Sequence, residues 1–238
     1  GSPDVMTTGD VDGNGADDVL AGFGSTIGGF WQKLNLGGWS QLNANSPDDV
    51  VTADVTGNGQ DDIVADFGSS VGGLFVKRNL GGWAQLHNSV PELLAVGDLD
   101  NSGRDDVVID FGGIGLWARM NDASWLKLHN SSPELIATGD LDGNGADDVL
   151  ATFTGLGLWQ KLNLGGWSKL NNNAPDEIVT GDVNASGQDD VVAAFGSTLP
   201  ASKLTVDVIG SPTAPPGRNA RWPKLSGSTT VTFTITAT

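Results

Sequence analysis

Short apolar runs recur along the chain at nearly constant spacing. Five of these runs end in Phe and cover residues 19–23, 63–67, 107–111, 149–153 and 191–195. Their shortness and β-branched content predict strands that are buried on both faces. Another short run precedes each of them, as in residues 49–53 and 134–138, and predicts a partner strand.

Glycine-rich turns follow each Phe in the first four units and introduce two further predicted strands, such as residues 29–35 and 39–43. Each unit therefore contains four predicted strands and no helical periodicity. Four strands in roughly 43 residues are typical of one blade of a β-propeller. A solenoid is the alternative, although β-helix repeats are usually much shorter. Since one blade cannot bury its own faces, we expect an all-β propeller of about five four-stranded blades.

One acidic signature occurs five times, starting at Asp10, Asp54, Asp98, Asp140 and Asp182. The copies read DVDGNGADD, DVTGNGQDD, DLDNSGRDD, DLDGNGADD and DVNASGQDD. The five repeats occupy residues 3–196 and begin near residues 3, 47, 91, 133 and 175. Each acidic segment is therefore expected to connect the first two strands of a blade.

The acidic segments have the ligand pattern of a calcium loop. Side-chain oxygens fall at positions 1, 3, 5 and 9, a backbone carbonyl at position 7 can complete the shell, and glycine permits the sharp bend. Calcium is expected because magnesium demands tighter octahedral geometry and soft metals prefer Cys or His. The predicted ligands are Asp10, Asp12, Asn14, Ala16 and Asp18; Asp54, Asn58, Gln60 and Asp62; Asp98, Asp100, Ser102, Arg104 and Asp106; Asp140, Asp142, Asn144, Ala146 and Asp148; and Asp182, Asn184, Ser186, Gln188 and Asp190.

The five loops differ in ligand number. The loops starting at Asp10 and Asp140 each offer three Asp and one Asn, whereas Thr56 and Asn184 replace the position-3 Asp in the second and fifth loops. We expect weaker binding in those two loops. The alternative is that Asp, Asn and Gly only form good turns. Five copies at fixed offsets favour the metal, and the absence of a position-12 Glu and of flanking helices distinguishes these loops from helical calcium hands.

Composition agrees with a cation as partner. The chain has 29 acidic and 12 basic residues and a formal net charge of −17. Nucleic acid and anionic membranes are poor partners, because both require a basic patch. Cysteine is absent, which excludes disulfides and thiolate chemistry. Most of the acids are concentrated in the five loops, where their mutual repulsion would destabilise a metal-free state.

The acidic loops, the apolar strand after each of them and the Phe-Gly pairs resemble FG-GAP/VCBS repeats. These pairs are Phe23-Gly24, Phe67-Gly68, Phe111-Gly112 and Phe195-Gly196, and Phe153-Thr154 departs from the pattern. The resemblance covers residue 3 to about residue 196. Such repeats form the integrin α-subunit propeller and bacterial and fungal propeller lectins. The resemblance implies a secreted, calcium-bearing propeller that serves adhesion or carbohydrate binding.

Aromatic residues also follow the repeat, in pairs eight residues apart. If residues 37–38 form a two-residue turn, Trp31 and Trp39 lie on opposite faces of the hairpin. Each cleft between blades would then receive Trp from both sides, and an indole beside amide and ammonium groups suits a sugar ring. The alternative is that these rings fill the wedge-shaped gaps between blades. The candidate glycan-binding residues are Trp31, Lys33, Asn35, Trp39, Trp83, Trp117, Arg119, Trp125, Trp159, Lys161, Asn163 and Trp167.

No catalytic constellation stands out. Residues 68–72 spell G-x-S-x-G, but they lie between two predicted strands and not at a strand-to-helix turn. His87 and His129 occupy equivalent repeat positions and read as repeat variation. We therefore predict a non-catalytic, lectin-like module that binds glycans or glycoproteins. The alternatives are a protein-adhesion or assembly module with purely structural calcium and, less favoured, a polysaccharide lyase or hydrolase.

Residues 197–238 depart from the repeat. Residues 203–208 and 221–225 predict a degenerate end of the last blade, and residues 231–236 alternate strictly as one more strand. That strand would either close the ring or pair with another chain as an exposed edge, giving a homo-oligomer.

Overall fold

Antiparallel sheets form the core of the part of the chain that the structure describes. The computed structural model describes residues 2–24 and 28–196, and within them eighteen strands form five sheets in chain order. We call these sheets 1 to 5. Sheets 1 to 4 have four strands each, and two strands of sheet 5 lie within the described residues.

Each sheet is a meander in which consecutive strands pair. Sheet 1 contains β1 (Val5–Gly9), β2 (Asp18–Gly22), β3 (Phe30–Lys33) and β4 (Trp39–Asn43). Sheet 2 contains β5 (Asp49–Ala53), β6 (Asp62–Asp66), β7 (Leu74–Lys77) and β8 (Trp83–His87). Sheet 3 contains β9 (Leu93–Gly97), β10 (Asp106–Asp110), β11 (Leu116–Met120) and β12 (Ser124–His129). Sheet 4 contains β13 (Leu135–Gly139), β14 (Asp148–Phe153), β15 (Gly157–Lys161) and β16 (Trp167–Asn171), and sheet 5 contains β17 (Glu177–Gly181) and β18 (Asp190–Ala194).

Helical structure in the described residues is confined to single turns. The α-helix α1 (Gly68–Val71) follows β6, and four 3-10 turns are η1 (Leu34–Leu36), η2 (Arg78–Leu80), η3 (Gly112–Ile114) and η4 (Leu162–Leu164). None of these helices has the length and apolar character needed to cross a membrane.

In sheets 1 to 4 the second strand is the most deeply buried element. Every residue of β6, β10 and β14 is buried, which confirms the prediction from their continuous apolar runs. Strand β18 is less buried and mixes partly buried with exposed positions. The sequence pattern is the same, so the difference comes from what packs against the sheet.

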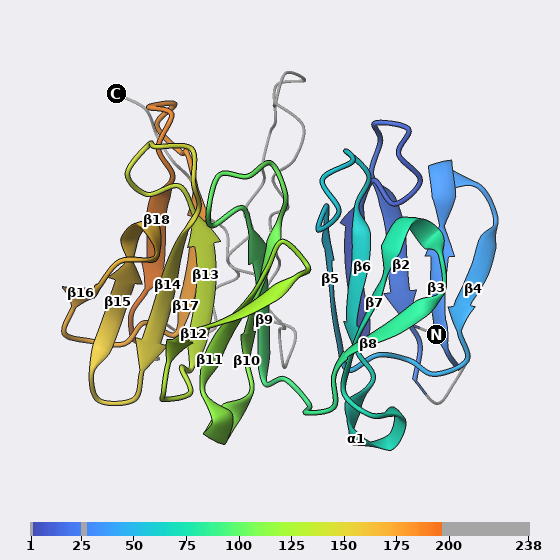
Figure 1. The fold of residues 1–238 in the computed structure, drawn as a ribbon, viewed down its shortest axis with the longest axis horizontal. Coiled ribbons are helices and arrows are strands. Elements are labelled where there is room, and N and C mark those ends of the chain that lie inside the picture. Colours follow the sequence, from blue (N-terminus) through green and yellow to red (C-terminus); the bar gives the residue numbers. More distant parts are fainter. Residues whose placement is uncertain (1, 25–27, 197–238) are drawn as a thin grey trace.

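The core lies between neighbouring sheets. The inner strands β1, β5, β9, β13 and β17 pack side by side in this order, and three apolar clusters join sheets 1 and 2, sheets 2 and 3, and sheets 3 and 4. Figure 1 shows sheets 1 to 4 upright and in chain order, from blue to yellow, and the orange sheet 5 overlaps sheet 4 in this view. Stacked four-stranded meanders with the first strand innermost are the architecture of a β-propeller. Within the described residues, β1 and β17 do not pack against each other in this way.

The predicted strands at residues 203–208, 221–225 and 231–236 lie outside the described residues. Whether they complete sheet 5, close the ring or pair with another chain stays a prediction.

Candidate metal centres

The acidic loops connect the first and second strands and lie at one end of the sheets, opposite α1 (Figure 1). In the first loop, Oδ1 of Asp10 accepts the backbone N–H groups of Gly13 and Asn14 at 2.9 and 3.0 Å, and Oδ2 accepts that of Gly15 at 2.7 Å. Gly13 and Gly15 have φ of 77° and 86°, which glycine adopts without steric cost. The backbone therefore wraps around the position-1 carboxylate, and the same pattern recurs in the other four loops.

The last Asp of each loop begins the buried second strand. Asp18 is 1% exposed, and its Oδ1 accepts the Asn35 N–H at 2.8 Å. Its Oδ2 is buried and has no hydrogen-bond partner among the described residues. A buried carboxylate oxygen without a donor costs free energy unless a cation or water completes its shell.

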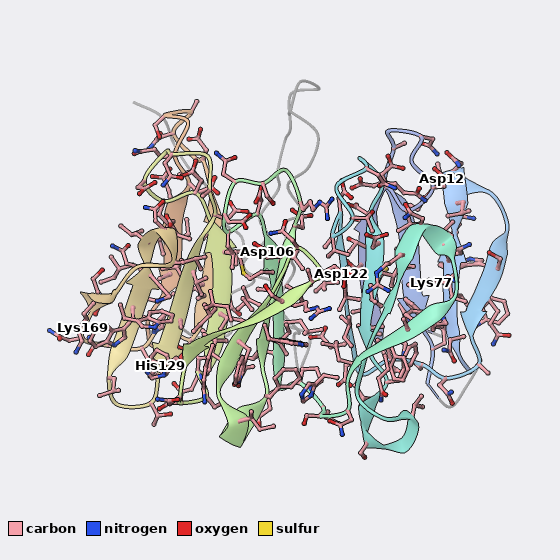
Figure 2. The ribbon with its side chains drawn as sticks, viewed as in Figure 1. Asp12, Lys77, Asp106, Asp122, His129 and Lys169 are labelled. Atoms are coloured by element: carbon pink, nitrogen blue, oxygen red, sulfur yellow. The ribbon has the colours of Figure 1, made fainter. Side chains whose placement is uncertain are left out.

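Three of the loops gather three carboxylates into one small volume. The groups are Asp10, Asp12 and Asp18; Asp98, Asp100 and Asp106; and Asp140, Asp142 and Asp148. Within each group, one carboxylate oxygen per residue lies within 4.8 Å of the others. In the second and fifth loops Thr56 and Asn184 take the position of the third carboxylate. The clusters thus occur in the loops that keep Asp at positions 1, 3 and 9, and Figure 2 shows Asp12 and Asp106 toward the loop end of the sheets.

Burial and mutual repulsion act on these carboxylates. Burial raises the pKa of Asp18, Asp62 and Asp148, and neighbouring loop carboxylates add to the effect. The pKa of Asp106 rises to about 7, again chiefly through burial. The donor set consists of oxygen atoms, it is strongly negative, and Asp18 offers an unpaired oxygen. These residues therefore fit a hard divalent cation, which would be held by the Asp side chains at positions 1, 3 and 9.

An Asn from the hairpin between the third and fourth strands supports each cluster. Asn35, Asn121 and Asn163 donate through Nδ2 to Asp12, Asp100 and Asp142 at 2.6, 2.8 and 2.7 Å. All three have φ of 50° to 51°, a left-handed conformation that Asn tolerates. The sequence places Asn35 and Asn163 among the glycan candidates, whereas the structure places them against the acidic loops. The signal for this role was the recurrence of Asn in each hairpin, two residues after a cationic residue.

The position-7 residues contact the preceding sheet where their side chains are long. Gln60 donates through Nε2 to the Val11 carbonyl at 2.5 Å, and Gln188 donates to the Asp142 carbonyl at 2.8 Å. Ala16 and Ala146 have no side chain for such a contact; their backbone N–H groups donate to Asn14 and Asn144 at 2.9 and 2.6 Å. Coordination of a metal by the carbonyls of position 7 stays a prediction.

Sequence reasoning missed the Asp at position 8, which ties each sheet to the one before it. Oδ2 of Asp61 accepts the Asp10 N–H at 2.9 Å, and the Asp61 N–H donates to the Asp10 carbonyl at 2.8 Å. Burial raises the pKa of Asp61 to about 7. The same pair of bonds joins the position-8 Asp of sheets 3, 4 and 5 to the position-1 Asp of the preceding sheet. The repetition of the Asp-Asp pair in all five copies was the available signal.

The predicted placement of the Trp pair on opposite faces is wrong. Trp39 pairs directly with Lys33, and Trp31 pairs with Gln41. Cross-strand partners lie on one face of a sheet, so Trp31 and Trp39 share a face. The reason is the turn, because the loop runs over residues 34–38 with a 3-10 turn and is longer than a two-residue hairpin.

Both aromatic residues of a pair consequently enter the same interface from one side. Trp117 and Trp125 pack against the cluster between sheets 2 and 3, and Trp159 and Trp167 pack against the one between sheets 3 and 4. Trp83 and Trp167 donate their indole N–H to a carbonyl of the preceding sheet at 3.2 and 3.0 Å. The Trp83 and Trp167 rings therefore fill the space between neighbouring sheets, which is the alternative prediction for the aromatic pairs.

The first Trp of each pair is different. Trp31, Trp117 and Trp159 donate their indole N–H to a loop of their own sheet at 2.8, 3.3 and 3.1 Å. Lys127 and Lys169, from the outermost strands, lie 5.2 and 5.0 Å from the Trp117 and Trp159 ring centroids. Lys169 lies at the outer edge of sheet 4 (Figure 2).

The remaining candidates also have defined positions. Lys33, Lys161 and Arg119 lie 5.9, 5.7 and 5.2 Å from the rings of the second aromatic residue of their own sheets, Trp39, Trp167 and Trp125. His87 and His129 stack on Phe111 and Phe153 of the following sheet, with centroids 4.4 Å apart in both cases. The two histidines therefore pack between sheets.

The fold defines this chain as a β-propeller protein. No protein-family model and no curated protein sequence matches it. Among solved structures, the chain is similar to the crystal structure of BBS1N in complex with ARL6DN, soaked with lead, with a TM-score of 0.50 and 12% sequence identity. The match covers 74% of this chain and 59% of that chain, so this chain spans less than two thirds of that neighbour. The neighbour is a β-propeller, and at this identity the likeness concerns the fold alone.

Proposed function

We propose that this chain is a calcium-binding β-propeller of the FG-GAP/VCBS type that acts outside the cell as a non-catalytic binding module for glycans. The observation that carries the proposal is the gathering of three carboxylates in each of three loops. An all-oxygen donor set with three negative charges is typical of calcium sites in proteins. The buried, unpaired Oδ2 of Asp18 supports a cation in the first loop.

Calcium is proposed to hold the loops closed and so to stabilise the stacking of the sheets. The loops also carry the position-1 Asp that bonds to the next sheet, for example Asp54 to Asp105. Binding to the folded state alone stabilises it by about 2.7 kcal/mol at a calcium concentration of 100 times Kd. Calcium should therefore raise the melting temperature, and a chelator should reverse the effect.

Ligand count provides a sharper test than chelation. Asp100→Asn removes one carboxylate from the cluster of the third loop, whereas Thr56→Asp restores the missing carboxylate of the second loop. Calorimetric calcium titration should show the loss of one strong site in the first variant and the gain of one in the second. Calcium binding that is absent, or that has the same stoichiometry in both variants and the parent, would contradict the proposal.

The partly buried rings of Trp117 and Trp159 are the proposed glycan contacts. Their indole N–H groups are already bonded, so each ring would contribute its face to sugar C–H groups while Lys127 or Lys169 donates to hydroxyls. A glycan array should give a signal that Trp159→Ala and Lys169→Ala both weaken. Trp167, whose ring packs between sheets, provides the control: Trp167→Phe should leave glycan binding in place. An array without any response would refute the glycan assignment and leave the calcium assignment standing.

An assembly module is the second candidate function. Met6 of sheet 1 and Val183 of sheet 5 favour it, because these apolar side chains are 62% and 64% exposed.

A further inference from the structure

The four junctions between neighbouring sheets repeat one set of polar contacts. In every junction, the position-8 Asp of the later sheet accepts the N–H of the position-1 Asp before it, at 2.9 to 3.1 Å. The N–H of the same position-8 Asp donates to the position-1 carbonyl at 2.7 to 3.0 Å. In three junctions a Thr hydroxyl of the later inner strand also donates to a carbonyl of the earlier one: Thr52 to Thr8, Thr138 to Val96 and Thr180 to Thr138.

Sheet 1 has the residues that the later sheet contributes to such a junction, but no described sheet packs against them. Its position-8 residue, Asp17, is exposed, and so is Thr8, the equivalent of Thr52. Within the described residues neither the Asp17 carboxylate nor the Thr8 hydroxyl has a hydrogen-bond partner. An apolar residue of the same face is exposed as well: Met6 is 62% exposed, whereas its counterpart Val50 is 4% exposed.

Sheet 5 has the residues that the earlier sheet contributes to such a junction, and no described sheet packs against them either. Asp182 is exposed, and no described residue bonds its backbone N–H or carbonyl as Asp61 does for Asp10. Val183 at position 2 is 64% exposed, whereas Val11, Val55 and Leu99 at this position are 0%, 2% and 1% exposed. The next sheet covers position 2 in those three cases, and none of the described residues covers it here.

We propose that the sheet 5 end of one chain docks onto the sheet 1 end of a second copy of this chain. The two faces are complementary because they repeat the four internal junctions: Asp17 of one copy accepts the Asp182 N–H of the other, Thr8 donates to the Thr180 carbonyl, and Met6 covers Val183. Residues 197–238 contain a single acid, Asp207, and no Asp-Asp pair, so they hold no further copy of the position-8 contact. Asp17 is thus the one position-8 Asp of the five without an earlier sheet in the described structure.

Such an interface is heterologous, because two different surfaces meet. Head-to-tail contacts generate rings or open filaments and not isolated two-fold dimers. Association is therefore expected to increase with concentration. Moderate ionic strength should favour it, because the net charge of −17 opposes contact between copies.

A mixing experiment tests the proposal. Met6→Glu blocks the sheet 1 end and Val183→Glu blocks the sheet 5 end, and both residues are exposed, so folding should be retained. In sedimentation velocity with calcium-containing buffer, the parent chain should associate, each variant alone should remain monomeric, and an equimolar mixture should form heterodimers and nothing larger. Leu156→Glu, in the turn between β14 and β15 and 52% exposed, is the control and should associate like the parent.

Two outcomes would overturn the proposal. A parent chain that remains monomeric up to several hundred micromolar means that something other than a second copy covers the ends. Association that persists in both blocked variants places the interface elsewhere. As a milder check, Thr8→Val introduces the residue that sheet 3 carries at this place, Val96, and should weaken association about five- to tenfold, the equivalent of one hydrogen bond.

Discussion

Asp66 offers a direct measure of the cost of burying carboxylates in this fold. Its side chain is 2% exposed at the end of β6, and its Oδ1 accepts the Gly68 N–H at 2.8 Å. Burial raises the pKa of Asp66 from 3.8 to about 6, and the nearby Asp48 and Asp49 add to the increase. The folded state therefore favours the protonated form of this carboxyl group.

The direction of the pH dependence follows from that shift. A group whose pKa is higher in the folded state contributes stability that is complete below its unfolded pKa of 3.8 and is lost as the pH rises through about 6. At roughly 1.4 kcal/mol per pKa unit, the shift corresponds to about 3 kcal/mol of unfolding free energy. Ionised Asp66 thus destabilises the protein at neutral pH.

Asp66→Asn removes this charge and keeps an oxygen for the Gly68 N–H. Urea unfolding should give the variant a free energy of unfolding up to about 3 kcal/mol above that of the parent near pH 7.5, and an equal one near pH 4. Asp66 lies at the end of β6 opposite the acidic loop, so calcium-dependent changes should cancel in the difference.

Asp110, the equivalent residue of sheet 3, provides a matched comparison. It additionally accepts the Ser132 hydroxyl at 2.6 Å, so Asp110→Asn should give a smaller gain. Sheets 1, 4 and 5 carry Gly22, Thr152 and Ala194 at this place, which shows that a neutral residue is compatible with the fold. A difference between Asp66→Asn and the parent that does not vary with pH would refute the reasoning.

Four further substitutions test the junctions and turns by urea unfolding. Asp105→Ala leaves the Asp54 N–H unpaired between sheets 2 and 3 and should cost about 1–3 kcal/mol, whereas an unchanged stability would mean that the contact contributes nothing. Leu74→Ala, at a side chain with 0% exposure, should cost about 2–5 kcal/mol, and a loss below 1 kcal/mol would indicate a loosely packed junction. Gly73→Ala places a Cβ 2.6 Å from a backbone carbonyl oxygen at a φ of 87° and should destabilise the protein by about 1–3 kcal/mol. The control is Gly38→Ala, whose Cβ meets no atom within 4 Å and should change the stability little. Equal effects of the two substitutions would contradict the steric argument.

Local patterns were sufficient to predict the strands and the repeat. A continuous apolar run such as residues 107–111 can only be satisfied by burial on both faces, and β10 is buried throughout. Likewise, the spacing of Asp98, Asp100 and Asp106 within one short loop placed their carboxylates together, and they lie within 4.8 Å. These features depend on residues close in sequence, whose geometry the chain itself constrains.

Contacts between sheets were decided by the tertiary structure. The longer loop at residues 34–38 put Trp31 and Trp39 on one face and brought Asn35 to the acidic loop of its own sheet. The partnership of Asp61 with Asp10 joins residues 51 positions apart, so the repeated Asp-Asp pair could single out Asp61 but could not reveal its partner. Exposure of Met6 and Val183 has the same origin: the strand pattern assigns each residue to a face, but only the packing of sheets determines whether another sheet covers that face.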